Sequence, residues 1–177
     1  ARQRLPQQPG SRRATAQAAD RRARTAGQLR GRPVKAVDGS TTQLPDTRKN
    51  QKAYPQPSGQ KPGCGFPVMK RSVLFSLASG ALLDVLMGHL HSHDLRLLRQ
   101  LWDALTRGDI LLADRAYGEY ATLAALPQRG VDVAARLHQA RKVDFRKAKR
   151  LGKNDGLFTW RRGDQQSQIV TPEAWAQ

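Results

Sequence analysis

The sequence predicts an α/β fold built around a mixed β-sheet, and two observations support this prediction. Apolar runs at 110–113 and 131–136 each follow a stretch with helical spacing, an order typical of parallel strands joined by helices. Earlier, apolar runs at 73–78 and 82–87 flank Ser79-Gly80, which favours a tight antiparallel turn. We therefore expect a three-stranded antiparallel start followed by parallel β-α-β units.

The amino-terminal third is less regular. Residues 1–33 are rich in Arg, Gln and Ala without an apolar stripe, so we interpret them as a basic arm or a partial helical region. Alternating residues predict a strand over 34–38 that Gly39 ends, and a short second strand near 41–44 can follow. Prolines and glycines predict a long loop from Pro45 to Pro67, with Tyr54 as its main exposed aromatic residue.

Two helices are predicted in the second half of the chain. The clearer one covers 92–105, where apolar residues recur every three or four positions: Leu95, Leu98, Leu101, Trp102 and Leu105. The second covers 117–126, because Pro127 is expected to break it. A further strand is possible at 157–160.

Composition indicates a polyanionic partner. The formal net charge is +17, with 31 Lys and Arg against 14 Asp and Glu. Basic side chains near phosphates release condensed counterions, so nucleic acid fits this charge, although a very soluble surface or a ribosomal-type protein is the alternative. The single cysteine, Cys64, excludes an internal disulfide and a CxxC zinc site and fits a reducing cytoplasm. No apolar run approaches the ~20 residues of a membrane span.

Two aspartates are the main candidates for chemistry. Asp38 and Asp114 each come at the carboxyl end of a predicted apolar strand, and such ends share one edge of an α/β sheet. If the two strands are neighbours, the carboxylates converge and offer the oxygen ligands that Mg²⁺ prefers. Bound divalent ions can promote displacement at a phosphodiester. Alone, Asp38-Gly39 reads as a turn, and Asp114 as a helix cap.

Several consecutive segments resemble insertion-sequence transposases of the bacterial DDE type. They are Val37–Thr41, Leu44–Thr47, Tyr54–Ser58, Leu111–Tyr117, Val131–Val133, Arg136–His138 and Arg141–Phe145. The resemblance runs from about Arg30 to about Arg162, about three quarters of the chain. It implies a ribonuclease H-like fold and DNA transposition, through strand cleavage and strand transfer that depend on Mg²⁺ or Mn²⁺.

The resemblance also implies roles for residues and partners. Asp38 is the first metal ligand and catalytic residue and Asp114 the second, while Arg115 reaches bound DNA or shapes the site and Tyr117 packs beside it. The partner is double-stranded DNA, both transposon ends and target, held by a homodimer of the intact parent. The expected location is the bacterial cytoplasm, in association with the nucleoid, and no membrane is involved.

The family's third carboxylate has no match in this sequence. It is a Glu on a later helix, with Tyr, Arg and Lys at fixed intervals, whereas Glu119 lies too close to Asp114 and Glu173 lacks that pattern. We therefore expect a partial catalytic core at 34–140, and at 141–177 the start of a strand-rich insertion that is truncated at the carboxyl end. The fragment is expected to be inactive alone. The alternatives are a non-catalytic DNA-binding fragment or another nuclease of the same fold.

Basic side chains are the remaining candidates. The run from 141 to 162 is predicted to contact DNA phosphates, chiefly through Arg141, Lys142, Arg146, Lys147, Lys149 and Arg150. The basic residues of the long loop either touch DNA or lie in a solvated excursion: Arg48, Lys49, Lys52 and Lys61. A histidine metal site on one strand face is a weaker alternative: His89, His91 and His93.

Overall fold

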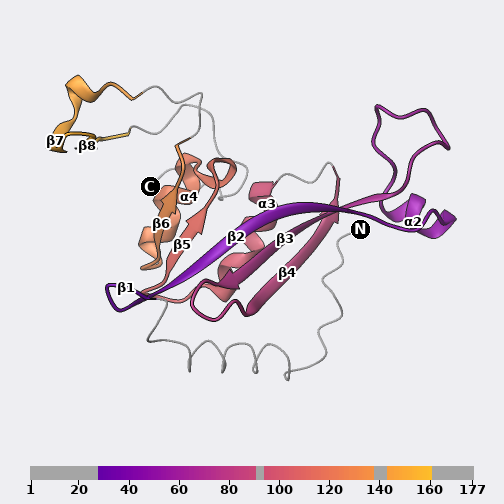
Figure 1. Ribbon diagram of the computed structural model, residues 1–177, viewed down its shortest axis with the longest axis horizontal. Helices are drawn as coiled ribbons and strands as arrows, with labels where there is room; N and C mark the ends of the chain where they lie inside the picture. Colours follow the sequence, from indigo (N-terminus) through magenta and orange to yellow (C-terminus); the bar gives the residue numbers. More distant parts are fainter. Residues whose placement is uncertain (1–27, 91–93, 138–142, 161–177) are drawn as a thin grey trace.

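A mixed β-sheet forms the centre of the molecule (Figure 1). The computed structural model describes residues 28–90, 94–137 and 143–160. The strands of the sheet are β1 (Gln28–Leu29), β2 (Arg32–Gln43), β3 (Val68–Ser76), β4 (Leu82–His89), β5 (Ile110–Ala113) and β6 (Asp132–Ala135). Their order is β4-β3-β2-β5-β6, with β1 paired to β2. Pairing is antiparallel from β2 to β4 and parallel from β2 through β5 to β6, so the predicted mixed α/β class is confirmed.

Strand β2 is longer than the sequence predicts. Gly39 does not end it: Gly39 pairs with Ser72 of β3, and the pairing continues to Gln43 and Val68. The prediction of two short strands was therefore wrong. An interior glycine weakens a strand by only about 0.5–1 kcal/mol, and the continuous ladder to β3 outweighs that cost. For the same reason β3 begins at Val68, ahead of the apolar run that starts at Val73.

The β3–β4 hairpin turns where Ser79-Gly80 predicts it. Gly80 has φ +67°, a left-handed conformation that favours glycine. Its N–H donates to the Ser76 carbonyl at 2.9 Å, and the Ser76 N–H donates to the Ala81 carbonyl at 2.9 Å. The predicted tight turn is therefore confirmed.

The helices differ in extent from the prediction, and the expected start of the first at 92–93 lies outside the described residues. Helix α3 spans Asp94–Leu101 and tightens into the 3-10 helix η1 (Trp102–Ala104). The expected helix at 117–126 is instead a 3-10 turn, η2 (Arg115–Tyr117), followed by α4 (Tyr120–Gln128). Pro127 lies inside α4, one residue before its end, so it does not break the helix ahead of it.

The main hydrophobic cluster lies on one face of the sheet. Alternate strand residues such as Val37, Leu74 and Leu111 meet α3, η1, η2 and α4 in one cluster. Trp102 and Leu98 are at most 2% exposed at its centre. Helix α3 contacts β3 and β4 and passes behind the sheet in Figure 1. In a strand successive side chains point to opposite faces, so Asp38, directly after Val37, points away from this core.

Two segments outside the sheet also differ from expectation. The predicted loop from Pro45 to Pro67 contains a short helix, α2 (Arg48–Ala53), and its Tyr54 is only 8% exposed, so its expected exposure was wrong. After the sheet come η3 (Phe145–Lys147) and a separate two-stranded hairpin of β7 (Lys149–Gly152) and β8 (Asp155–Leu157). The strand expected at 157–160 thus ends at Leu157. Among the described helices, none is long and apolar enough to cross a membrane.

Candidate functional site

Asp38 and Asp114 lie side by side at one edge of the parallel sheet. The register between β2 and β5 ends with Val37 opposite Ala113, so the next residue of each strand is an aspartate. Asp114 keeps extended backbone (φ −74°, ψ 169°), so both side chains leave on the same face of the sheet. Neighbouring strands are about 4.8 Å apart. The two carboxylates are therefore close neighbours.

Each carboxylate is oriented by a backbone amide next to it. The N–H of Gly39 donates to Oδ1 of Asp38 at 2.8 Å, and the N–H of Arg115 donates to Oδ1 of Asp114 at 2.6 Å. Within the described ranges, Oδ2 of each aspartate accepts no hydrogen bond and neither residue forms an ion pair. Both residues are exposed. One oxygen of each is thus available to a ligand arriving from solvent.

No third ligand completes a cluster in the part of the chain that the structure describes. No group of three His, Cys, Asp or Glu side chains there is arranged to hold a metal ion. His89 lies on β4, whereas His91 and His93 fall outside the described residues, as does Glu173. Two carboxylates are hard oxygen donors of the kind that Mg²⁺ and Mn²⁺ accept, so the pair fits part of the coordination shell of such an ion.

The residues that follow Asp114 serve the site in different ways. Arg115 opens η2, and its backbone N–H orients the carboxylate, while its side chain is partly exposed. Tyr117 is 2% exposed and belongs to the core cluster, which agrees with the expected packing role. The 3-10 turn therefore ties the loop after β5 to the core.

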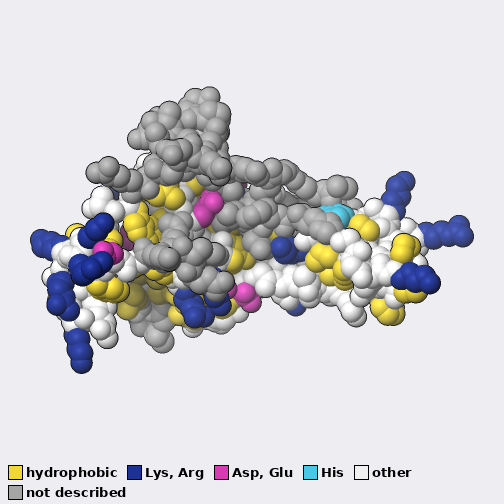
Figure 2. All heavy atoms as spheres, turned by 90° about the horizontal axis from the view of Figure 1, so that it is seen from above, with side chains coloured by type: hydrophobic (Ala, Val, Ile, Leu, Met, Phe, Trp, Pro, Cys, Tyr) yellow, Lys and Arg dark blue, Asp and Glu magenta, His cyan; other side chains and the backbone are white. Residues whose placement is uncertain are grey.

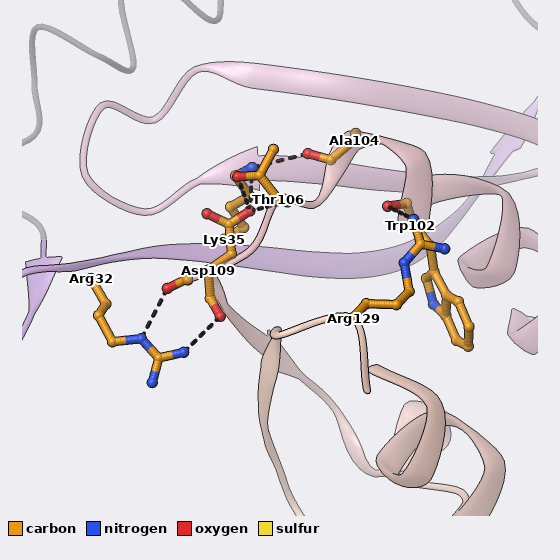
Figure 3. Close-up of polar contacts among 8 residues, drawn as sticks. Arg32, Lys35, Trp102, Ala104, Thr106, Asp109 and Arg129 are labelled. Carbon is orange, nitrogen blue, oxygen red and sulfur yellow. Dashed lines mark hydrogen bonds and ion pairs between the residues drawn. The ribbon is translucent and has the colours of Figure 1, made fainter. Parts of the chain in front are cut away.

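A buried ion pair joins β2 to the residue directly before β5, at the opposite end of their paired segment. The Nζ of Lys35 lies 2.6 Å from Oδ2 of Asp109, with side chains 8% and 2% exposed. Lys35 also donates to the carbonyl of Ala104, and Oδ2 of Asp109 accepts from the N–H and hydroxyl of Thr106 (Figure 3). Arg32 adds hydrogen bonds to the carbonyls of Gly108 and Asp109. This network stabilises the register between β2 and β5, and that register brings Asp38 and Asp114 next to each other.

Sequence patterns missed this network. A lysine between apolar residues on a strand reads as a solvent-facing position, and Asp109 reads as the polar start of the next strand. The signal available was the alternation itself, which puts Lys35 on the same face as the core residue Val37.

The basic run after residue 141 is only partly engaged by acids. Arg146 contacts both carboxylate oxygens of Asp144, at 2.9 and 3.2 Å. This side-chain hydrogen bond lowers the pKa of Asp144 and raises that of Arg146. Three neighbouring cations are exposed and form no ion pair within the described residues: Lys147, Lys149 and Arg150. Arg141 and Lys142 lie outside the described residues.

Comparison with known proteins adds one match. A family model described as "Transposase DDE domain" matches residues 29–176, from the second residue of β1 through β8. No curated protein matches the chain, and no solved structure does.

Proposed function

The chain belongs to the transposase DDE domain family, and from this premise we propose that it acts on double-stranded DNA at a divalent-metal site formed by Asp38 and Asp114. The proposed reaction is strand cleavage followed by strand transfer, carried out by a homodimer on two transposon ends. The proposed fold is ribonuclease H-like, and the mixed sheet of the described residues is consistent with it.

One observation carries the site assignment. Two exposed carboxylates occupy the same register position at the carboxyl ends of neighbouring parallel strands, with their Oδ1 atoms held by backbone amides. Two unpaired anions this close repel one another, which is unfavourable unless a cation lies between them. Ligands in α/β sheets bind at such strand ends.

The proposed roles of the chain's own groups follow from their positions. Asp38 and Asp114 would supply two oxygen ligands to Mg²⁺ or Mn²⁺. When bound, such an ion stabilises negative charge on the attacking and leaving oxygens of a phosphodiester. Gly39 and Arg115 keep the carboxylates oriented through their N–H groups, so no rotation is needed before a ligand arrives. Arg115 and the unpaired cations Lys147, Lys149 and Arg150 would bind DNA phosphates.

The assignment is tested by binding of Mn²⁺ to the full chain. We expect Asp38→Asn and Asp114→Asn each to weaken Mn²⁺ binding at least about tenfold, because each removes a charged ligand. Asp103→Asn is the control, since Asp103 is an exposed aspartate in η1, not at the ends of β2 and β5, and pairs with Arg129. Electron paramagnetic resonance of free Mn²⁺ gives the affinity. Unchanged Mn²⁺ affinity in both site variants contradicts the proposed metal site.

A non-catalytic DNA-binding protein is the second candidate. It is favoured by the lack of a three-ligand metal cluster among the described residues, together with the net charge of +17. It predicts salt-sensitive DNA binding that Mn²⁺ does not strengthen and that Asp38→Ala leaves unchanged. Wild-type binding to duplex DNA with and without Mn²⁺ separates the two candidates.

A further inference from the structure

A ribbon of β2 and β3 extends past the two aspartates. The parallel pairing of β2 with β5 stops at Val37 and Ala113, whereas the pairing of β2 with β3 continues to Gln43 and Val68. Gln43 is the fifth residue after Asp38, and a strand rises about 3.4 Å per residue. The ribbon therefore reaches about 17 Å beyond the aspartates. Its end carries α2 and the loop that follows, at the right of Figure 1.

We name residues 44–67, at the end of this ribbon, the platform. The platform is strongly basic: it holds four Lys and Arg and a single acid, Asp46, so its net charge is +3 (four minus one). The four cations are all exposed: Arg48, Lys49, Lys52 and Lys61. None of them forms an ion pair within the described residues, and Asp46 accepts a hydrogen bond from Gln51 instead. In Figure 2, Lys and Arg side chains project from the right-hand end of the molecule, where no Asp or Glu is in view, and others gather at the left-hand end.

The platform is held together by two glutamines. Gln51 donates to Asp46 and to the carbonyl of Gly65, at 2.8 and 2.9 Å. Gln56 donates to the carbonyls of Gln60 and Lys61, and its Oε1 accepts from the N–H groups of Gly63 and Gly65. The Gln56 N–H itself donates to Oε1 of Gln51. The two side chains thus link both halves of a segment that would otherwise be a long, unsupported loop.

The platform is also anchored to the sheet. The Leu44 N–H donates to the Pro67 carbonyl at 2.9 Å and closes its two ends. Thr47 caps α2 by accepting from the Asn50 N–H, and Tyr54 is buried. Charges carried on an ordered segment lose less conformational entropy on binding than charges on a free loop. Of the two interpretations of this segment, the structure therefore favours a contact with DNA over a loop that only extends into solvent.

We propose that the platform is a docking surface for the phosphate backbone of duplex DNA, about 17 Å from the aspartate pair. At about 3.4 Å per nucleotide along a strand, this distance spans about five base pairs. The cations of the platform form no ion pair within the described residues. Its Tyr54 ring is buried and its Phe66 ring is 55% exposed, so the platform presents four charges and one ring to a partner, and none of these distinguishes one base from another. It would therefore position DNA without reading its sequence. This inference rests on the proposed function, since it assumes the DNA that the aspartate pair would act on.

The test is equilibrium binding of the full chain to a duplex of about 25 base pairs, in EDTA, across a salt series. The platform variant is Arg48→Gln/Lys49→Gln/Lys52→Gln; glutamine is a good helix former, so α2 is kept. The control is Arg30→Gln/Arg107→Gln/Arg129→Gln, which removes the same charge at the opposite end of β2 and β5. A plot of log K against log salt concentration falls with increasing salt. Each lost phosphate contact makes this slope less steep by about 0.9.

We expect the platform variant to lose about 2 to 3 units of that slope and at least about tenfold in affinity at ~100 mM salt, with a much smaller loss in the control. Equal losses in the two variants show that only net charge matters and overturn the docking surface. The metal site is tested separately, by the Mn²⁺ measurement. Absence of duplex binding by the wild-type chain overturns both the docking surface and the proposed function.

Discussion

At the residue scale, Lys35 and Asp109 form a buried ion pair whose two members depend on each other. We expect Lys35→Met to destabilise the protein by about 3–5 kcal/mol, because it leaves the Asp109 carboxylate buried without its cation. Adding Asp109→Asn removes that charge and keeps an acceptor for Thr106, so the double variant should recover most of the loss. Urea unfolding measures both. An equal loss in the single and double variants would rule out charge coupling as the cause.

The aspartates at the other end of these strands behave differently, because they are exposed. Replacing either one with asparagine removes repulsion between neighbouring carboxylates, so without metal the melting temperature should stay equal or rise. With Mn²⁺ present, only the wild-type chain should gain stability, since binding to the folded state shifts the equilibrium by mass action. Thermal melts with and without Mn²⁺ measure this. A wild-type melting temperature that does not change when Mn²⁺ is added contradicts this expectation.

At the element scale, the part of the platform that follows α2 depends on glutamine side chains and not on secondary structure. We expect Gln56→Ala to speed hydrogen exchange at the amides of Gly63 and Gly65, whose acceptor it removes, while amides of β3 keep their protection. Gln43→Ala is a suitable control, because Gln43 is exposed at the tip of β2 and its side chain makes no hydrogen bond in the described part of the chain. Exchange rates that match in the two variants would show that the platform is not cross-linked as described.

At the scale of the whole molecule, the main hydrophobic cluster lies on one face of the sheet, and substitutions at neighbouring leucines of β5 should show this. Leu111 is 0% exposed and faces the helices, whereas Leu112 points to the opposite face and is 42% exposed. We expect Leu111→Ala to cost about 2–5 kcal/mol, because it leaves a cavity in close-packed surroundings. Leu112→Ala should cost less than half as much. Urea midpoints of the two variants provide the comparison, and similar losses would mean that both faces are equally packed.

Sequence patterns predicted the structure correctly where interactions between residues close in the sequence determine it. Alternation and apolar runs located the strands, and Ser79-Gly80 located the hairpin turn, because side-chain periodicity and glycine's left-handed conformation act over a few residues. The same patterns failed where contacts with residues distant in the sequence determine the local structure. Gly39 continues a strand because β3 hydrogen-bonds to it, and the helix expected to start at Ser92 tightens at Trp102 as it enters the core.

The sequence by itself determined the mixed α/β class, the basic charge, the two candidate aspartates and the family resemblance that the family comparison confirms. Only the tertiary structure decided that Asp38 and Asp114 share one register position, that Lys35 is buried against Asp109, and that the basic platform is ordered. The physical reason is that strand register and side-chain cross-links join residues tens of positions apart, and no local pattern specifies which distant partner is chosen.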